Sequence, residues 1–360
     1  KEKLDNMKKK ILITTGGSGG HVMPALILSK HLLKEFDVVL TTDKRGLNFF
    51  DKNIDKFKII NTPRLNNIFF LPLNLFKILF LTIKSVFFLK NEKINKLIST
   101  GGYMSLPLIL AAKFCRLKIY LLEPNLVLGR ANRFFLNSCE KIFCYTEQIK
   151  NFPMQFKDKI VLINPLVREE FYRNKENSFK KNKFNLLIIG GSQGASFFDK
   201  NLKNSIVNVS KKYVIKVIQQ TKEKNISILK EFYSKNNIQN FIFSFSENFK
   251  ELIQESDFSI TRAGASTLAE LSISNIPFLA VPLPTSKDNH QLENANFYKD
   301  KDCCWVIDQH SLEVNADEIL LNILSNKDDF LRKKENLKKL NYQNTWINVN
   351  QKILSVLNEN

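Results

Sequence analysis

Short apolar segments alternate with amphipathic segments along the chain, and most of the apolar segments end in a glycine-rich or polar turn. The first apolar segment, Ile11–Thr15, is rich in β-branched residues, and apolar residues take up helical spacing after Pro24. A strand, a turn and a helix in this order form the repeating unit of a parallel α/β sheet. The pattern therefore predicts an α/β fold in which strands alternate with helices.

Further apolar segments predict two successive sheets. The expected strands of the first half are 36–43, 96–100, 117–122, 141–145 and 159–165. Those of the second half are 186–189, 214–218, 241–245, 258–261 and 278–281. Between the halves, residues 168–183 are charged and rich in asparagine, which is typical of a linker. A chain of 360 residues thus predicts two domains, 1–166 and 167–343, with an amphipathic C-terminal helix (344–360) packing back on the first.

Glycine-rich turns follow strands in both halves. They are Gly16-Gly-Ser-Gly-Gly-His21, Gly101-Gly-Tyr103 and Gly190-Gly-Ser-Gln-Gly194. Without Cβ atoms, the backbone N–H groups of such turns can approach a phosphate at a helix N-terminus. None is a dinucleotide fingerprint, since Val22 stands where a third glycine is needed, and none is a P-loop. We therefore predict two Rossmann-like domains that bind phosphorylated ligands; the alternative is tight turns without a ligand.

The second half adds polar candidates beside a small-residue turn at 264–267. Arg262 precedes this turn and can reach a diphosphate. Glu270 lies one turn into the following helix, where it can accept a hydrogen bond from a ribose or serve only as an acid favoured by the helix dipole. In the first half, Asp43 ends the second strand, and we expect it to cap the next helix rather than hold a ribose.

Residues 65–89 form a dense apolar stretch. Pro72, Asn74, Lys77 and Lys84 interrupt it, so its uncharged runs fall short of the roughly 18–20 residues of a membrane span. A helix over about 74–89 must bury one face on its own sheet, yet it has more apolar side chains than one face can hold. We expect the excess to enter the headgroup region of an anionic membrane; the alternative is a buried crossover helix. The expected membrane residues are Phe69, Phe70, Phe76, Lys77, Phe80 and Lys84.

The positive net charge of the chain favours some classes of binding partner but does not choose among them. The formal net charge is +19 and the pI about 9.6, which favours phosphorylated ligands, anionic lipid or nucleic acid. A two-domain nucleic-acid binder is not favoured, because the sequence contains no recognition-helix or stacking motif. Five cysteines without a CxxC pair indicate a reducing compartment, and four histidines without a His/Cys cluster predict no metal site.

Taken in order, the motifs resemble one family, the MurG family of peripheral-membrane N-acetylglucosaminyltransferases of bacterial peptidoglycan synthesis. The matching stretches run from about residue 8 to 357 and are Gly16–His21, Gly101–Tyr103, Glu123–Asn125, Asn164–Pro165, Gly190–Ala195, Arg262–Glu270 and His290–Asn294. Two stretches depart from the family pattern. Leu122 replaces a histidine, and Gln219–Lys222 replaces a His-Gln-Ser/Thr-Gly stretch.

The resemblance implies the glycosyltransferase-B fold, with two Rossmann-like domains facing across a cleft. It implies inverting transfer of GlcNAc from UDP-GlcNAc to the C4 hydroxyl of MurNAc in lipid I, which gives lipid II, without a cofactor. The implied location is the cytoplasmic face of the inner membrane, on an anionic surface, with a part in cell-wall biogenesis, cell shape and cell division. The alternatives are a related transferase acting on another lipid and a sugar-nucleotide epimerase of the same fold.

The resemblance also implies roles for individual residues. The implied donor-binding residues are Ser18, Gly19, Asn125, Arg168, Ser192, Gln193, Gln220, Phe245, Arg262, Ala265, Glu270 and Gln291. The acceptor diphosphate is expected over Gly17, Gly19, Gly20, Gly102 and Tyr103. His21 is the candidate general base, since an imidazole titrates near neutrality; the alternative is a loop cap or a phosphate contact.

Overall fold

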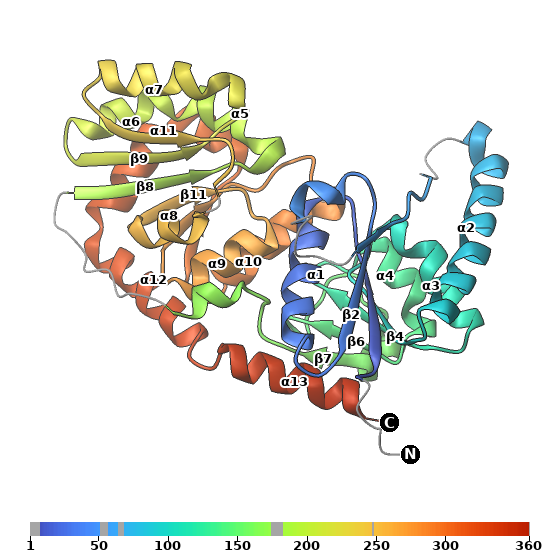
Figure 1. The fold of residues 1–360 in the computed structure, drawn as a ribbon. Helices are drawn as coiled ribbons and strands as arrows, with labels where there is room; N and C mark the ends of the chain where they lie inside the picture. Colours follow the sequence, from blue (N-terminus) through green and yellow to red (C-terminus); the bar gives the residue numbers. More distant parts are fainter. Residues whose placement is uncertain (1–7, 51–56, 64–67, 174–182, 247, 360) are drawn as a thin grey trace. The chain divides into compact units, whose positions relative to one another are not determined.

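A computed structural model describes residues 8–50, 57–63, 68–173, 183–246 and 248–359 of the chain. The chain divides into two compact units. The first unit contains Lys1–Val167 and Trp346–Asn360, and the second contains Arg168–Thr345. Each is an α/β unit with its own sheet and its own apolar core (Figure 1).

The described strands of the first unit form one parallel sheet in the order β3-β2-β1-β4-β5-β6-β7. Their bounds are Lys10–Thr14 (β1), Asp37–Thr42 (β2), Phe57–Ile59 (β3), Ile94–Ser99 (β4), Lys118–Glu123 (β5), Lys141–Cys144 (β6) and Ile160–Leu162 (β7). The order of connection reverses between β1 and β4, which is the topological switch point of a doubly wound sheet.

Helices cover both faces of this sheet. Their bounds are Gly19–Leu32 (α1), Leu71–Asn91 (α2), Leu106–Phe114 (α3), Arg130–Phe135 (α4) and Trp346–Asn358 (α13). Short 3-10 helices are Gly46–Phe49, Ile68–Phe70, Tyr103–Ser105, Leu136–Ser138 and Met154–Lys159. Ile11 and Ile13 of β1 join the core beneath α1 and α13, while Leu12 joins the core beneath α3. Successive side chains of a strand alternate between faces, so a continuously apolar strand is buried on both.

The second unit repeats this plan with the order β10-β9-β8-β11-β12-β13. Its strands are Lys183–Ile189 (β8), Val214–Gln220 (β9), Gln239–Phe243 (β10), Phe258–Thr261 (β11), Phe278–Ala280 (β12) and Cys304–Val306 (β13). Its α-helices are Gly191–Asn201 (α5), Lys203–Ser210 (α6), Ile226–Lys235 (α7), Phe249–Glu255 (α8), Ala265–Ile273 (α9), His290–Lys299 (α10), Gln309–Ser325 (α11) and Lys327–Leu340 (α12). Short 3-10 helices are Glu169–Tyr172, Glu223–Asn225 and Lys287–Asn289. The switch point of this sheet lies between β8 and β11.

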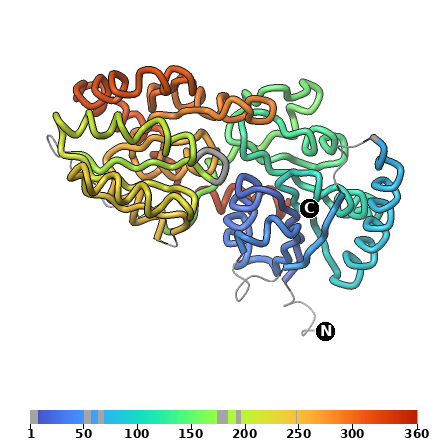
Figure 2. Tube along the Cα trace, turned by 90° about the horizontal axis from the view of Figure 1, so that it is seen from above, coloured from blue at the N-terminus to red at the C-terminus, as the bar shows by residue number. Residues whose placement is uncertain are grey.

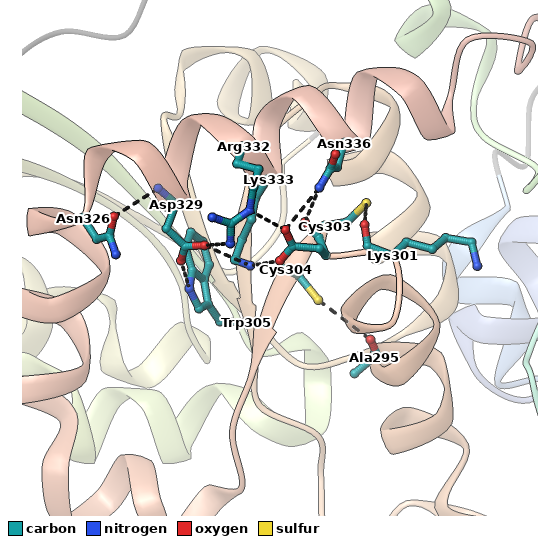
Figure 3. Close-up of polar contacts among 11 residues, drawn as sticks. Ala295, Lys301, Cys303, Cys304, Trp305, Asn326, Asp329, Arg332, Lys333 and Asn336 are labelled. Carbon is teal, nitrogen blue, oxygen red and sulfur yellow. Dashed lines mark hydrogen bonds and ion pairs between the residues drawn. The ribbon is translucent and has the colours of Figure 1, made fainter.

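A polar network ties α12 to the edge strand β13 (Figure 3). The carboxylate of Asp302 accepts hydrogen bonds from Arg332 Nε and Lys333 Nζ, each at 2.6 Å. Trp305 Nε1 donates to Asp329 at 2.8 Å. Because Lys333 is buried, its charge has to be paired, and the two carboxylates supply that pairing.

The structure confirms the expected fold class of two parallel α/β sheets. The sequence pattern missed β3 and β13, which are three-residue strands at sheet edges and too short to show a period. It placed the other strands correctly to within a few residues. Of the expected linker, residues 174–182 lie outside the described part of the chain.

Candidate active site

The glycine-rich turns lie at the switch points of the two sheets. Residues 15–18 connect β1 to α1, and Gly101 and Gly102 follow β4, the neighbour of β1. In the second unit, Gly190 follows β8 and Gly264 follows β11, its neighbour. Open α/β sheets bind ligands outside the carboxyl ends of the strands at this point. The candidate residues of each unit therefore lie at the edge where open α/β sheets bind their ligands.

His21 has a defined ring orientation. Its Nδ1 lies 2.8 Å from the backbone oxygen of Thr100, at the end of β4. A carbonyl oxygen only accepts hydrogen bonds, so Nδ1 carries the proton and Nε2 carries the lone pair of the neutral ring. This tautomer gives His21 a basic nitrogen on the side of the ring away from Thr100.

The N-terminus of α1 has the form of an anion site. Ser18 is the N-cap residue, and its side chain makes no capping hydrogen bond. Gly19 and Gly20 occupy the first two helical positions, whose N–H groups have no partner within a helix. Gly17 differs, because its N–H donates to Asp43 Oδ1 at 2.8 Å. Of the expected acceptor residues, Gly19 and Gly20 thus present backbone donors, and Gly17 shapes the turn.

The carboxylate of Asp43 accepts several hydrogen bonds beside this turn. Its Oδ1 also accepts from Gly46 N at 2.9 Å, at the start of the 3-10 helix Gly46–Phe49, although the N-cap residue of that helix is Arg45 and not Asp43. Burial raises the pKa of Asp43, but the hydrogen bonds from Gly17, Gly46 and Arg45 outweigh it and hold the pKa below its ordinary value. Arg45 in turn donates to the hydroxyl of Tyr103 at 2.8 Å. The structure thus joins the two glycine turns of the first unit through Arg45, a residue that the sequence pattern did not single out.

Glu123 organises the turn after β5. The side chain is buried and accepts from Gly129 N at 2.8 Å and from Asn132 Nδ2 at 2.9 Å through Oε2. Its Oε1 accepts from the backbone and side-chain amides of Asn125 at 3.2 and 3.3 Å. Burial raises the pKa of Glu123, and these donors oppose the rise. Glu123 therefore fixes the conformation of Asn125, the expected contact of the donor sugar.

In the second unit, Gln220 links the first glycine turn to the end of β10. Its Oε1 accepts from Gly191 N at 3.0 Å and its Nε2 donates to Ser244 O at 3.3 Å. Gly191 has φ +61°, and a Cβ there would meet open space. Phe245 follows Ser244 and is 76% exposed. The side chains of Ser192 and Gln193, two further candidates, lie outside the described part of the structure.

Glu270 and Arg168 form an ion pair. Arg168 Nε donates to Glu270 Oε1 at 2.8 Å, and Glu270 is nearly buried on α9. Burial raises the pKa of Glu270, while the charge of Arg168 opposes the rise. The structure thus brings together two of the expected donor-binding residues that lie about a hundred positions apart in the chain.

Arg262 is almost completely buried, and its guanidinium is bonded within the second unit. It is 5% exposed, and Nη1 donates to Val281 O at 3.0 Å while Nη2 donates to Gln309 at 2.8 Å. Burial lowers its pKa to about 10. The contact with a diphosphate stays a prediction, and the structure adds a second role, in which Arg262 holds the segment after β12.

Gln291 and Asn294 support the same edge from α10. Gln291 Oε1 accepts from Leu283 N at 2.8 Å, and Asn294 Nδ2 donates to Ala263 O at 3.2 Å. Ala263 lies just before Gly264 and Ala265, where α9 begins. Asn294 therefore fixes the start of the small-residue turn in which Ala265 was expected to meet the sugar, and Gln291 holds the loop after β12.

The two departures from the family pattern are accommodated inside the units. Leu122 is fully buried in the core of the first unit. Gln219 is also buried, and it donates to Asp199 and accepts from Tyr233, each at 2.8 Å. Both side chains belong to the interior and not to the exposed strand ends.

α2 lies at the periphery of the first unit, where it packs beside α3 (Figures 1 and 2). Four residues anchor it by burial: Ile78, Ser85, Phe88 and Leu89. Exposed large side chains along α2 and just before it are Phe69, Phe70, Leu73, Leu75, Phe76, Leu79, Phe80, Ile83 and Phe87, with Phe69 at 89%. Among the described helices, α2 is long and apolar enough to cross a membrane by length and composition. The contacts of its buried side chains make it part of the first unit.

A pocket of about 580 Å³ lies elsewhere in the second unit, against β13, α11 and α12, and contains none of the expected site residues. We place the candidate active site at the switch points, where the candidate polar residues and glycine turns lie. Among the described residues, no group of three or more His, Cys, Asp or Glu side chains is arranged to hold a metal ion.

Comparison with known proteins identifies the family. Residues 11–144 match the glycosyltransferase family 28 N-terminal domain, and residues 185–345 match its C-terminal domain. The chain is 50% identical over 356 residues to the UDP-N-acetylglucosamine–N-acetylmuramyl-(pentapeptide) pyrophosphoryl-undecaprenol N-acetylglucosamine transferase of Pelagibacter ubique, covering 98% of this chain and 100% of that protein. The chain belongs to this family of transferases. The Rickettsia felis member is 35% identical over 328 residues, with 87% and 90% of the two chains covered.

A solved family member has the same fold. The crystal structure of MurG from Acinetobacter baumannii superposes with a TM-score of 0.76 at 22% identity, covering 97% of this chain and 98% of that one. The resemblance read from the motifs is therefore confirmed, and with it the glycosyltransferase fold of two parallel α/β units.

Proposed function

We propose that the protein transfers GlcNAc from UDP-GlcNAc to the C4 hydroxyl of MurNAc in lipid I and so forms lipid II for peptidoglycan. The observation that carries this proposal is the pair of switch-point edges, each with polar side chains fixed by hydrogen bonds, in a chain that belongs to a family of GlcNAc transferases. The second unit, Arg168–Thr345, would bind the donor. The first unit, with the C-terminal helix, would bind the acceptor and the membrane.

On the donor side, Glu270 would accept the ribose hydroxyls while its ion pair with Arg168 keeps the carboxylate in place. The backbone at Phe245 would read the uracil edge. Ser192, Gln193 and the turn at Gly264 and Ala265 would cradle the diphosphate with helix N-termini. Such donors stabilise the charge that develops on the leaving UDP.

On the acceptor side, the C4 hydroxyl must lose a proton as its oxygen attacks the anomeric carbon. His21 would accept that proton through Nε2, because Nδ1–H is held by Thr100. The acceptor diphosphate would lie over the N-terminus of α1 and the turn at Gly102 and Tyr103. Asn125, fixed by Glu123, would meet the GlcNAc together with Gln291.

The acceptor carries a polyprenyl chain, so its headgroup reaches the enzyme only at a membrane surface. The exposed phenylalanines of α2 would enter the headgroup region, and Lys77 and Lys84 would meet anionic lipid. The protein would then bind peripherally to the cytoplasmic face of the inner membrane and contribute to cell shape and division.

A single assay tests the proposal against its alternatives. Purified protein is incubated with radiolabelled UDP-GlcNAc and with lipid I, a diacylglycerol or no acceptor. We expect label in the lipid I product alone. Label in the diacylglycerol would favour a transferase with another lipid acceptor, and a 2-epimerised sugar nucleotide without acceptor would favour an epimerase.

A further inference from the structure

Arg45 reaches both glycine turns of the first unit. It lies after β2, and its Nη2 donates to the hydroxyl of Tyr103 at 2.8 Å, just beyond Gly102. A Cβ built on Gly17, in the other turn, would lie 3.4 Å from the same nitrogen. The guanidinium therefore lies against both segments over which the acceptor diphosphate is proposed to bind.

The carboxylate of Asp43 holds the guanidinium of Arg45 in place. Nε and Nη2 both donate to Asp43 Oδ2 at 3.2 Å, while Asp43 Oδ1 is occupied by the N–H groups of Gly17 and Gly46. Gly46 is needed next to Arg45, because a Cβ there would lie 2.1 Å from Thr42 Oγ1. The carboxylate thus locks the turn at Gly17 and the arginine into one arrangement.

Arg45 also keeps donors to spare. A guanidinium has five N–H groups, and three of them are used by Asp43 and Tyr103. The two N–H groups at Nη1 make no hydrogen bond with the described residues, and the side chain is 45% exposed. The Nη1 group can therefore donate two further hydrogen bonds and carries part of the guanidinium charge, which suits a phosphate group.

We infer that Arg45 binds the diphosphate of the acceptor lipid and that Asp43 is its positioning residue. The inference rests on the proposed acceptor, since it assumes a diphosphate at the N-terminus of α1. Tyr103 then has two functions, because it lies in the acceptor segment and also orients Arg45 through its hydroxyl. The backbone donors of Gly19 and Gly20 and the charge of Arg45 would approach the diphosphate together.

The test measures steady-state kinetics of Arg45→Met and Arg45→Lys with lipid I and UDP-GlcNAc. For Arg45→Met we expect KM for the acceptor to rise about 10-fold to 100-fold, the loss expected for charge-assisted hydrogen bonds, with KM for UDP-GlcNAc within twofold of wild type. Arg45→Lys should recover part of the loss, because lysine keeps the charge but lacks the planar guanidinium with its fixed donors. The matched control is Lys44→Met, which removes the neighbouring exposed charge and should change KM for the acceptor less than threefold.

A second measurement asks whether the diphosphate is the group recognised. A soluble short-chain prenyl diphosphate should inhibit the wild-type enzyme competitively against lipid I, and more strongly than the matching monophosphate. Arg45→Met should lose this preference. The inference is overturned if both variants at position 45 keep the wild-type KM for lipid I, if Lys44→Met shows the same loss, or if UDP-GlcNAc binding and the unfolding temperature fall in parallel with acceptor binding. If wild-type protein transfers nothing to lipid I, the proposed function fails instead.

Discussion

At the residue scale, several polar side chains act by holding the turns that follow the carboxyl ends of the strands. Glu123 holds Asn125, Gln220 holds Gly191, and Gln291 holds Leu283. A site that is fixed before its ligand binds loses less conformational entropy on binding and keeps its reacting groups in the required geometry. The roles of His21 and Glu270 can be tested separately, because His21 belongs to the first unit and Glu270 to the second.

If His21 is the general base, His21→Ala should lower kcat by about 10²-fold to 10⁴-fold and leave UDP affinity nearly unchanged. The wild-type hydrogen bond to Thr100 directs the proton to Nδ1, so the loss should appear on the limb of the pH–rate profile that reports the base. The exposed histidine of α11 provides the control, His310→Ala, which should keep the wild-type kcat. A loss of tenfold or less in His21→Ala would make His21 a positioning residue.

Glu270→Ala should weaken UDP binding by about 1.5–3 kcal/mol, because the ribose hydroxyls lose a charged acceptor. Calorimetric titration with UDP measures this directly. Glu170→Gln is the matched variant, since Glu170 also contacts Arg168, at 3.5 Å, but from an exposed position, and it should bind UDP normally. Unchanged affinity in a folded Glu270→Ala protein would exclude Glu270 from the donor site.

At the element scale, α2 has many more apolar side chains than its packing on the first unit buries. Its buried side chains account for its attachment to the first unit, whereas its other phenylalanines and most of its other leucines are exposed. A contiguous apolar surface with flanking lysines is typical of a helix that lies in the membrane interface.

Replacing Phe69 and Phe70 together with serine should release the protein from anionic vesicles, while UDP binding stays unchanged. Added salt should weaken binding of the wild type, because screening shortens the reach of the lysine charges. Co-sedimentation at low and high salt measures both effects. Ile347→Ser provides the control, since Ile347 is exposed on α13, and α13 packs on the face of the sheet opposite to α2 and α3. Wild-type protein that stays in the supernatant with anionic lipid at low salt would contradict the membrane proposal.

At the scale of the whole molecule, the chain crosses back to complete its first unit. α13 brings Val349, Ile353 and Leu357 into the core beneath α1, and the ring of Trp346 stacks on His31 at 3.5 Å. Lys96 of β4 donates to the backbone oxygen of Leu357 near the end of α13. The first unit therefore cannot bury its core fully until the last residues of the chain are in place.

This contact should make stability depend on pH. Burial lowers the pKa of His31 to about 4, below the ordinary value near 6.5, so the unfolded chain binds the extra proton between these values. Stability from the neutral ring is complete above about pH 6.5 and is lost as the pH falls toward 4. Between about pH 7.5 and pH 5.5 the wild type should lose about 1 kcal/mol more than His31→Phe, as measured by denaturant unfolding. Equal losses in the two proteins would show that His31 is already protonated or exposed in the folded state.

The local pattern of the sequence determined most of the strands, the glycine turns, the fold class and, through the order of its motifs, the family. These features depend on neighbours in the chain: β-branched runs form strands, and glycines occur where backbone groups must approach a ligand. The sequence also marked Glu270 and His21, because each lies at a fixed distance from a recognisable turn.

Only the tertiary structure decided which distant residues meet. Arg168 reaches Glu270, Arg45 reaches Tyr103, and Gln219 turns inward to Asp199, and in each case strand order, not spacing in the chain, brings the pair together. The enclosure of Arg262 could not be predicted either, because its burial depends on the backbone just after β12 and on side chains of α5 and α11. Periodicity reports which face of an element is apolar, whereas the partner of a polar group is set by the three-dimensional path of the whole chain.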